Sequence, residues 1–274
     1  MNSFNIKILF IAFMCITLYT SCSTTYFYST MSTNDPYTYK NDRGIFVQEG
    51  DSLDVSYNFF GENAPITIGI TNKMSVAIYV DWRKSGVIID SIISPFAGTV
   101  QIQNENDNVN FSQYMNNPLG ISYIRPHSRY EKQVMELANF NFDKIPRDNF
   151  TEGYTEADSK GRNRQANMIG YNESNSPLFM QTYLTIYKEP SGNAHDPLVY
   201  ESDFYISELI RGGKRTGLQS FKDKQGDIFF VRYEKGKIFQ NIGKSSQKAA
   251  GITATALGSI AAWAIEGAVR NKDQ

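Results

Sequence analysis

Residues 66–90 carry the clearest alternation of hydrophobic and polar side chains in this sequence. Ile66, Ile68 and Ile70 alternate with polar or small residues, and a second alternation follows a polar break and ends at Trp82. Successive side chains of a β-strand point to opposite faces, so this period of two predicts strands with one buried face. We expect three strands here, joined by short polar turns into an antiparallel meander.

Similar short runs occur on both sides of this stretch. They predict strands within residues 44–47, 53–60, 98–103, 121–124, 178–188, 198–210 and 228–233. Residues 131–142 fit both helical and strand spacing, and we favour a strand because Asn and Phe weaken a helix there. The chain is therefore predicted to be mainly β. We expect an antiparallel Ig-like β-sandwich of about eight to ten strands over residues 44–240.

Two polar segments interrupt this pattern. Residues 22–43 are rich in Ser, Thr, Tyr and Asn, and they are interpreted as a flexible tether before the sandwich. Residues 150–176 hold many charges and few apolar side chains, which predicts a long polar loop within the domain.

The composition changes completely over residues 245–270, where Ala, Gly and Thr dominate. The pattern predicts a C-terminal α-helix, with Arg270 suited to its C-terminal end. Small residues at near-helical spacing permit close helix packing, so this helix is expected to dock on the sandwich or on a partner, or to mediate self-association. A membrane span is the alternative, although the uncharged part is slightly short for one.

The N-terminus has the layout of an export signal. Lys7 precedes an apolar run over residues 8–20, and Ser21-Cys22 follows. A small residue before a cysteine after such a run resembles the lipobox of bacterial lipoproteins, of the looser kind common in Bacteroidetes. The resemblance implies that residues 1–21 are a lipoprotein signal peptide and that Cys22 is lipidated. Cleavage as an ordinary signal or retention as an anchor are the alternatives.

Charge and candidate chemistry narrow the function classes. The formal net charge is −1 with no long basic run, so no nucleic-acid partner is expected. The two histidines, His127 and His195, stand far from any cluster of metal-ligating residues, so no metal site or cofactor is predicted. No motif for a catalytic triad is present, and we expect no catalytic residues and no enzymatic activity.

Two places are candidates for binding. Arg211, Lys214 and Arg215 lie in a basic, glycine-rich segment that we interpret first as a mobile hairpin loop, with binding of an anion or a lipid headgroup as the alternative. Trp82 could form a platform for a sugar, but its place in an alternating strand favours the core.

The segment Ile68-Gly69-Ile70-Thr71-Asn72-Lys73 and the following Ile78-Tyr79-Val80-Asp81-Trp82 resemble uncharacterised lipoproteins of Bacteroidetes. They resemble, more distantly, Ig-like and late-embryogenesis-abundant (LEA-type) β-sandwiches. The resemblance implies the sandwich fold and an envelope setting, and it carries no catalytic residue.

These observations predict a lipid-anchored protein of the bacterial cell envelope, an outer-membrane lipoprotein facing the periplasm rather than the cell surface. Its partners would be the membrane, through the lipid on Cys22, and an envelope protein or a second copy. We expect a non-enzymatic binding or assembly module. The alternative is a carbohydrate-binding or glycan-processing lipoprotein, for which Asp81, Glu201 and Asp203 are the nameable carboxylates.

Overall fold

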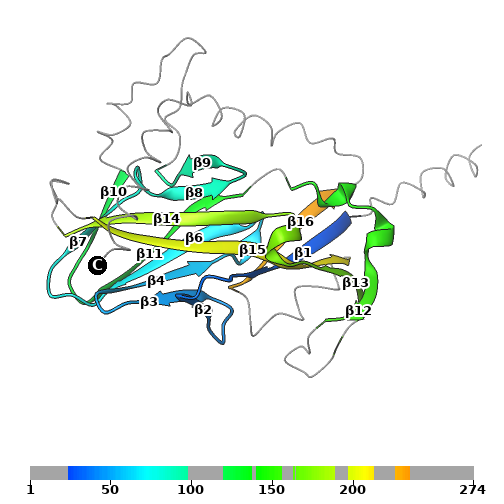
Figure 1. The fold of residues 1–274 in the computed structure, drawn as a ribbon, viewed down its shortest axis with the longest axis horizontal. Helices are drawn as coiled ribbons and strands as arrows, with labels where there is room; N and C mark the ends of the chain where they lie inside the picture. The colour runs from blue at the N-terminus through cyan, green and yellow to red at the C-terminus, as the bar shows by residue number, and fades with distance from the viewer. Residues whose placement is uncertain are drawn as a thin grey trace, which may run out of the picture.

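The computed structural model describes residues 24–97, 120–137, 140–155, 163, 165–188, 197–212 and 226–234. This part of the chain is mainly β (Figure 1), and its helical segments are single 3-10 turns. The strands are β1 (Thr24–Ser32), β2 (Thr38–Lys40), β3 (Phe46–Glu49), β4 (Leu53–Asn58), β5 (Gly61–Glu62), β6 (Pro65–Asn72), β7 (Ile78–Asp81), β8 (Gly86–Ile89), β9 (Ile92–Pro95), β10 (Ile121–Ile124), β11 (Ser128–Glu136), β12 (Thr151–Tyr154), β13 (Gln165–Gly170), β14 (Phe179–Tyr187), β15 (Leu198–Gly212) and β16 (Ile228–Glu234).

The strands form two sheets. The smaller sheet has the order β11-β6-β4-β3-β2, and the larger sheet has the order β10-β7-β14-β15-β1-β16-β5. The β8–β9 pair joins the larger sheet along β14, and the β12–β13 pair joins it along β15. Neighbouring strands are antiparallel in the described part except for the short parallel pair β16–β5.

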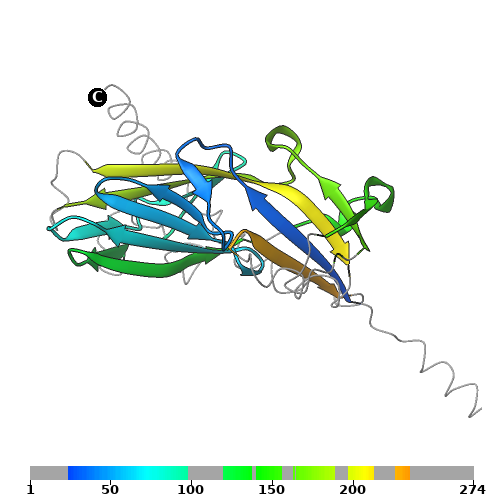
Figure 2. The same cartoon turned by 90° about the horizontal axis from the view of Figure 1, so that it is seen from below.

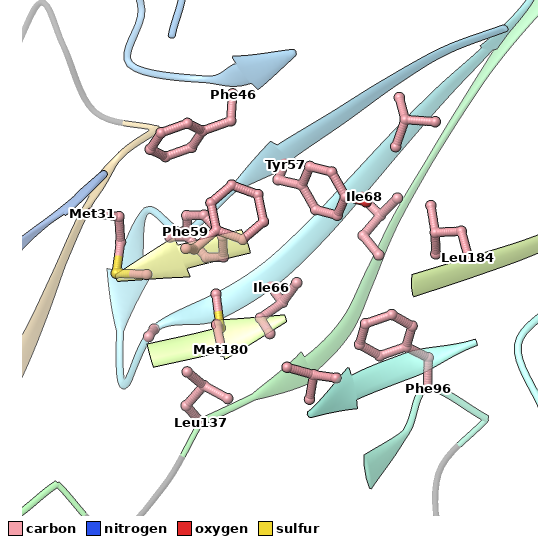
Figure 3. Packing of buried hydrophobic residues seen from close by; sticks show 14 of the residues in the cluster. Met31, Phe46, Tyr57, Phe59, Ile66, Ile68, Phe96, Leu137, Met180 and Leu184 are labelled. Carbon is pink, nitrogen blue, oxygen red and sulfur yellow. The ribbon is translucent and has the colours of Figure 1, made fainter. Parts of the chain in front are cut away.

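The two sheets pack face to face over one end of the larger sheet, and aromatic rings fill the space between them. Phe204 of the larger sheet lies 5.1 Å from Phe46 and 5.0 Å from Tyr57 of the smaller sheet, measured between ring centroids. Figure 3 shows Ile66, Ile68 and Leu184 in the same layer. Burying side chains of this size contributes about 1.5–3 kcal/mol each, so this shared layer is what holds the two sheets together.

The larger sheet continues well past the smaller one. β15 pairs with β14 along its first half and with both β1 and β13 along its last residues. Figure 2 shows this long strand leaving the two-layered half and running beside β1 into an extension. The molecule therefore has a sandwich-like half and a second half built on the extended sheet.

The inward-facing residues of the central stretch were predicted correctly, but the meander was wrong. Ile66, Ile78 and Trp82 are all buried. β6 pairs with β4 and β11 in the smaller sheet, whereas β7 and β8 pair with β14 in the larger sheet. Alternation shows which face of a strand is buried but does not show which sheet the strand joins, so consecutive strands could change sheets unnoticed.

Asn72 fixes the place where the chain crosses from one sheet to the other. β6 and β11 pair in the smaller sheet and continue, across the bend, as the pair β7 and β10 in the larger one. The fully buried Asn72 amide donates to the carbonyls of Val76 and Arg125, at 2.9 and 3.0 Å, and its oxygen accepts from the Met74 N–H at 3.0 Å. One side chain thus satisfies three backbone groups that the bend removes from the sheet ladders.

Replacing Asn72 with Ala is expected to lower the free energy of unfolding by about 1–3 kcal/mol, because it removes three hydrogen bonds between a fully buried side chain and backbone groups of the bend. Urea unfolding followed by circular dichroism measures this loss. Asn58→Ala is the matched control, because Asn58 accepts a single hydrogen bond, from the exposed Phe60 N–H. Equal losses for the two variants would contradict a special role for Asn72.

The predicted tether over residues 22–43 is wrong for the part that the structure describes. β1 lies between β15 and β16 and pairs with both along its length. Phe27 packs in the core shared with the smaller sheet, whereas Tyr26 and Tyr28 pack in a second cluster. Because both faces of β1 are covered, its consecutive aromatic residues are all buried, and the sequence shows no simple alternation. Residues 38–40 form the edge strand β2.

Phe27→Ala is expected to cost about 3–5 kcal/mol of stability, the usual loss on removing a large aromatic side chain from a core. Tyr37→Ala is the control from the same predicted tether, because Tyr37 is 76% exposed, and it should change stability by about 0.5 kcal/mol or less. Chemical denaturation of both variants distinguishes a packed strand over residues 24–32 from a flexible tether. A Phe27 variant as stable as the Tyr37 variant would restore the tether.

The predicted polar loop over residues 150–176 contains a β-hairpin, so this prediction is wrong in part. β12 pairs with β13, and β13 extends the larger sheet along β15. Most side chains of the hairpin are exposed, which explains why the segment lacks the hydrophobic signal of a strand. The predicted strand at 98–103 and the predicted C-terminal helix at 245–270 lie outside the described residues. Within the described ranges, no helix has the length and hydrophobicity needed to cross a membrane.

Candidate functional site

The extended half of the larger sheet ends where β1 begins and β15 finishes. One face of this end is covered by residues 140–150, which Tyr233 fastens to the sheet. The Tyr233 hydroxyl donates to the Phe140 carbonyl at 2.5 Å and accepts from the Phe142 N–H at 3.2 Å. Its burial raises the pKa of Tyr233 to about 12, so the hydroxyl keeps its proton and its donor role at neutral pH.

Arg211 lies at this end, next to the covering segment. Its guanidinium carbon is 5.9 Å from the centre of the Phe27 ring and 5.9 Å from that of Phe150. The two rings are themselves 6.2 Å apart, so the guanidinium packs against a pair of adjacent aromatic rings. Phe27 is the cross-strand partner of Arg211 in the β1–β15 pair, so the register of the sheet sets the contact between these two side chains.

A recess of about 380 Å³ opens beside this arginine. The described residues that line it are Thr24 and Thr25 of β1, Arg147 and Phe150 of the covering segment, Asn167 of β13, and Arg211 and Gly212 of β15. Four chain segments that are distant in sequence thus meet here. Two guanidinium groups, two hydroxyls and one carboxamide supply hydrogen-bond donors, and the described lining contains no carboxylate.

Of the three predicted basic residues, the structure places Arg211 in this recess, whereas Lys214 and Arg215 lie outside the described residues, as does Cys22. The sequence analysis missed Arg147, Asn167 and the pair Thr24 and Thr25. Arg147 follows Pro146 in a segment with no regular pattern, and Thr24 and Thr25 belonged to the supposed tether. The long-range strand pairing that brings these residues next to Arg211 leaves no pattern in the sequence around any one of them.

Trp82 lies in the core and is fully buried, as its place in the alternating strand predicted. Its indole N–H donates to the Ser122 hydroxyl at 2.8 Å, and Ser122 also contacts the Tyr130 hydroxyl at 3.0 Å. The Lys132 ammonium lies 4.8 Å from the centre of the indole ring, and burial lowers the pKa of Lys132. The ring is therefore occupied by the protein's own groups and offers no surface for a sugar.

The carboxylates named for glycan chemistry have separate structural environments. Asp81 forms a two-pronged ion pair with Arg83, with N–O distances of 2.7 and 2.8 Å, in the turn between β7 and β8. Burial raises the pKa of Asp203, and the charges of Asp35 and Glu173 raise it further. Asp81 is thus bound to Arg83 at the end of β7, whereas Asp203 lies opposite Gln181 in the β14–β15 pair, so the two carboxylates have different partners.

The raised pKa of Asp203 predicts a pH effect on stability. Its folded-state pKa lies above the ordinary 3.8, so deprotonation costs the folded protein more than the unfolded one, and stability falls as pH rises through this range. Asp203→Asn removes the charge and should stabilise the protein at neutral pH, with a smaller gain below pH 3.8. Thermal unfolding at both pH values measures this difference. The exposed Asp42→Asn is the control, and an equal, pH-independent effect in both variants would contradict the prediction.

Among the described residues, no group of three or more His, Cys, Asp or Glu side chains is arranged to hold a metal ion. His127 is exposed in the turn before β11, and His195 lies outside the described part. The chain matches no protein-family model, and no curated protein and no solved structure is significantly similar to it.

Proposed function

We propose that this protein is a lipid-anchored binding or assembly module of the bacterial cell envelope, attached to the membrane through Cys22. The observation that carries the proposal is the order of the N-terminal segments. A positively charged start, an apolar run and Ser21-Cys22 come first, and a buried β-strand begins at Thr24. An export signal that ends directly before a folded domain is the arrangement of a processed precursor.

The short distance between Cys22 and β1 gives the proposed anchor a geometric consequence. Two residues span at most about 7 Å, so an acyl group on Cys22 would hold the start of β1 against the lipid surface. The protein would then rest on the membrane by the extended end of its larger sheet, with the sandwich-like half directed away from it. This differs from the flexible tether expected from the sequence.

The finer architecture is part of this proposal. Two sheets that are antiparallel apart from the pair β16–β5, with a chain that crosses between them, support an Ig-like sandwich, and such sandwiches commonly serve as binding modules. The C-terminal helix over residues 245–270 remains a prediction, and we propose it as the element for docking on an envelope partner or for self-association. An outer-membrane, periplasm-facing location is proposed with it.

A non-enzymatic role is supported by how the buried charges are used. Asp81 is paired with Arg83, and the buried Asp227 is paired with Lys40 at 2.6 Å, next to the start of β16. Both pairs secure turns or strand ends. The carbohydrate alternative loses Trp82 as its platform, and the nearby rings of Tyr79 and Tyr123 meet at 56°, so they do not form one flat surface.

Intact-mass analysis and membrane fractionation of the native protein beside a Cys22→Ala variant test the anchor. We expect a chain that starts at Cys22, carries a diacyl or triacyl mass and sediments with membranes. The variant should lose the added mass and the membrane association together.

Cys15→Ala is the matched control, because Cys15 lies within the apolar run and would be removed with the signal. It should leave the mass and the fractionation unchanged. An unmodified mature chain that fractionates as a free protein would contradict the proposal, and the domain would then be a periplasmic or secreted binding protein.

A further inference from the structure

We propose that the recess lined by Arg147 and Arg211 binds a phosphate group, and that this phosphate belongs to a phospholipid headgroup of the membrane. The source of the phosphate rests on the proposed anchor at Cys22, whereas the phosphate site itself rests on the structure of the recess. The protein would then hold its membrane by two contacts: the acyl group and a headgroup bound beside it.

The lining of the recess favours an anion. Arg147 and Arg211 bring two permanent positive charges, and Thr24, Thr25 and Asn167 add neutral hydrogen-bond donors. Asp148 is next to Arg147 in the chain but does not line the recess. Neither arginine forms a salt bridge with another described residue. Guanidinium groups without a salt-bridge partner can form charge-assisted hydrogen bonds with phosphate oxygens.

Arg211 is held in place before any ligand arrives. Phe27 and Phe150 both contact its guanidinium, and because the two rings are 6.2 Å from each other and 5.9 Å from the guanidinium carbon, both pack on one side of this group. The N–H groups at its edge remain free to donate, and less side-chain entropy is lost on binding. Because Phe27 is fully within the core, the position of this donor is set by the fold rather than by a loop.

The place of the recess identifies the ligand's source. Thr24 and Thr25, which line it, are the second and third residues after Cys22. Three residues span at most about 11 Å, so an acylated Cys22 keeps the recess close to the layer of lipid phosphates. This distance is similar to the Debye length of about 8–10 Å at physiological salt, so the arginines would experience the surface charge of an anionic membrane.

Vesicle binding by the full chain carrying Cys22→Ser tests the proposal without help from an acyl group. Phosphatidylcholine vesicles are compared with vesicles that also contain phosphatidylglycerol, and bound protein is measured by cosedimentation. We expect binding to depend on the anionic lipid. Arg147→Gln with Arg211→Gln should weaken it about twenty-five-fold, because each basic residue at such a surface contributes a factor of about five.

Arg125→Gln with Arg129→Gln is the control, because it removes the same charge from strand β11 of the smaller sheet and from the turn between β10 and β11, away from the end that holds β1, β12 and β13 (Figure 1). This variant should bind like the unsubstituted chain. Thermal unfolding of each variant checks its fold, and Arg147→Gln alone, at an exposed position, serves if the double variant is unstable.

Equal binding by the two double variants would overturn the proposal. Direct binding of glycerol phosphate, set beside vesicle binding, distinguishes the two sources of phosphate. Saturable binding of this soluble ester that needs both arginines, without arginine-dependent binding to the anionic vesicles, would assign a free phosphate compound to the recess and remove the membrane from the proposal. The vesicle assay does not depend on whether Cys22 is acylated in the native protein, because it uses the Cys22→Ser variant. Intact-mass analysis tests the acylation separately.

Discussion

The backbone hydrogen bonds that β1 forms with both of its neighbours hold the extended half of the protein together. In the described pairings, β16 and β5 join the larger sheet through β1, and β1 in turn lies beside the last residues of β15. Without this strand, the sheet would end at β15, and the core residues Phe27 and Met31 would be missing. The candidate recess depends on the same strand, because Thr24 and Thr25 form one of its walls.

The sandwich-like half depends on a different local constraint. The paired strands that pass from one sheet to the other must interrupt their ladders at the bend, and partly buried backbone groups without partners would destabilise this bend. Asn72 supplies the missing partners from one side chain. With the bend secured, β6 and β7 can contribute isoleucines to both walls of the same core.

The sequence predicted the strands well where one face is buried and the other exposed. β4 is such a case, because Leu53, Val55 and Tyr57 are buried and the residues between them are half-buried. It failed for β1, whose buried aromatic residues stand in succession among Ser and Thr, and for the largely exposed β12–β13 hairpin. Period-two alternation reports a difference between faces, and neither of these segments has that alternation.

The candidate site was predictable only in part for a related reason. Arg211 stood out in a basic, glycine-rich segment, but Arg147, Asn167 and the threonines of β1 have no common motif. They meet because β13 and β1 flank the end of β15 while residues 140–150 cover it, and that arrangement depends on long-range pairing. Trp82 shows the converse: its chemistry suggested binding, but its alternating context correctly placed it in the core.

The central claim is that residues 24–32, which begin two positions after Cys22, form a strand of the larger sheet and not a tether. Hydrogen–deuterium exchange of the backbone amides of Phe27, Tyr28 and Ser29 tests it most directly. The account predicts protection close to that of the amides in β14 and β15, since a strand paired on both edges opens only with the sheet. Exchange at the rate of an unstructured peptide would contradict it, because residues 24–32 would then be a tether.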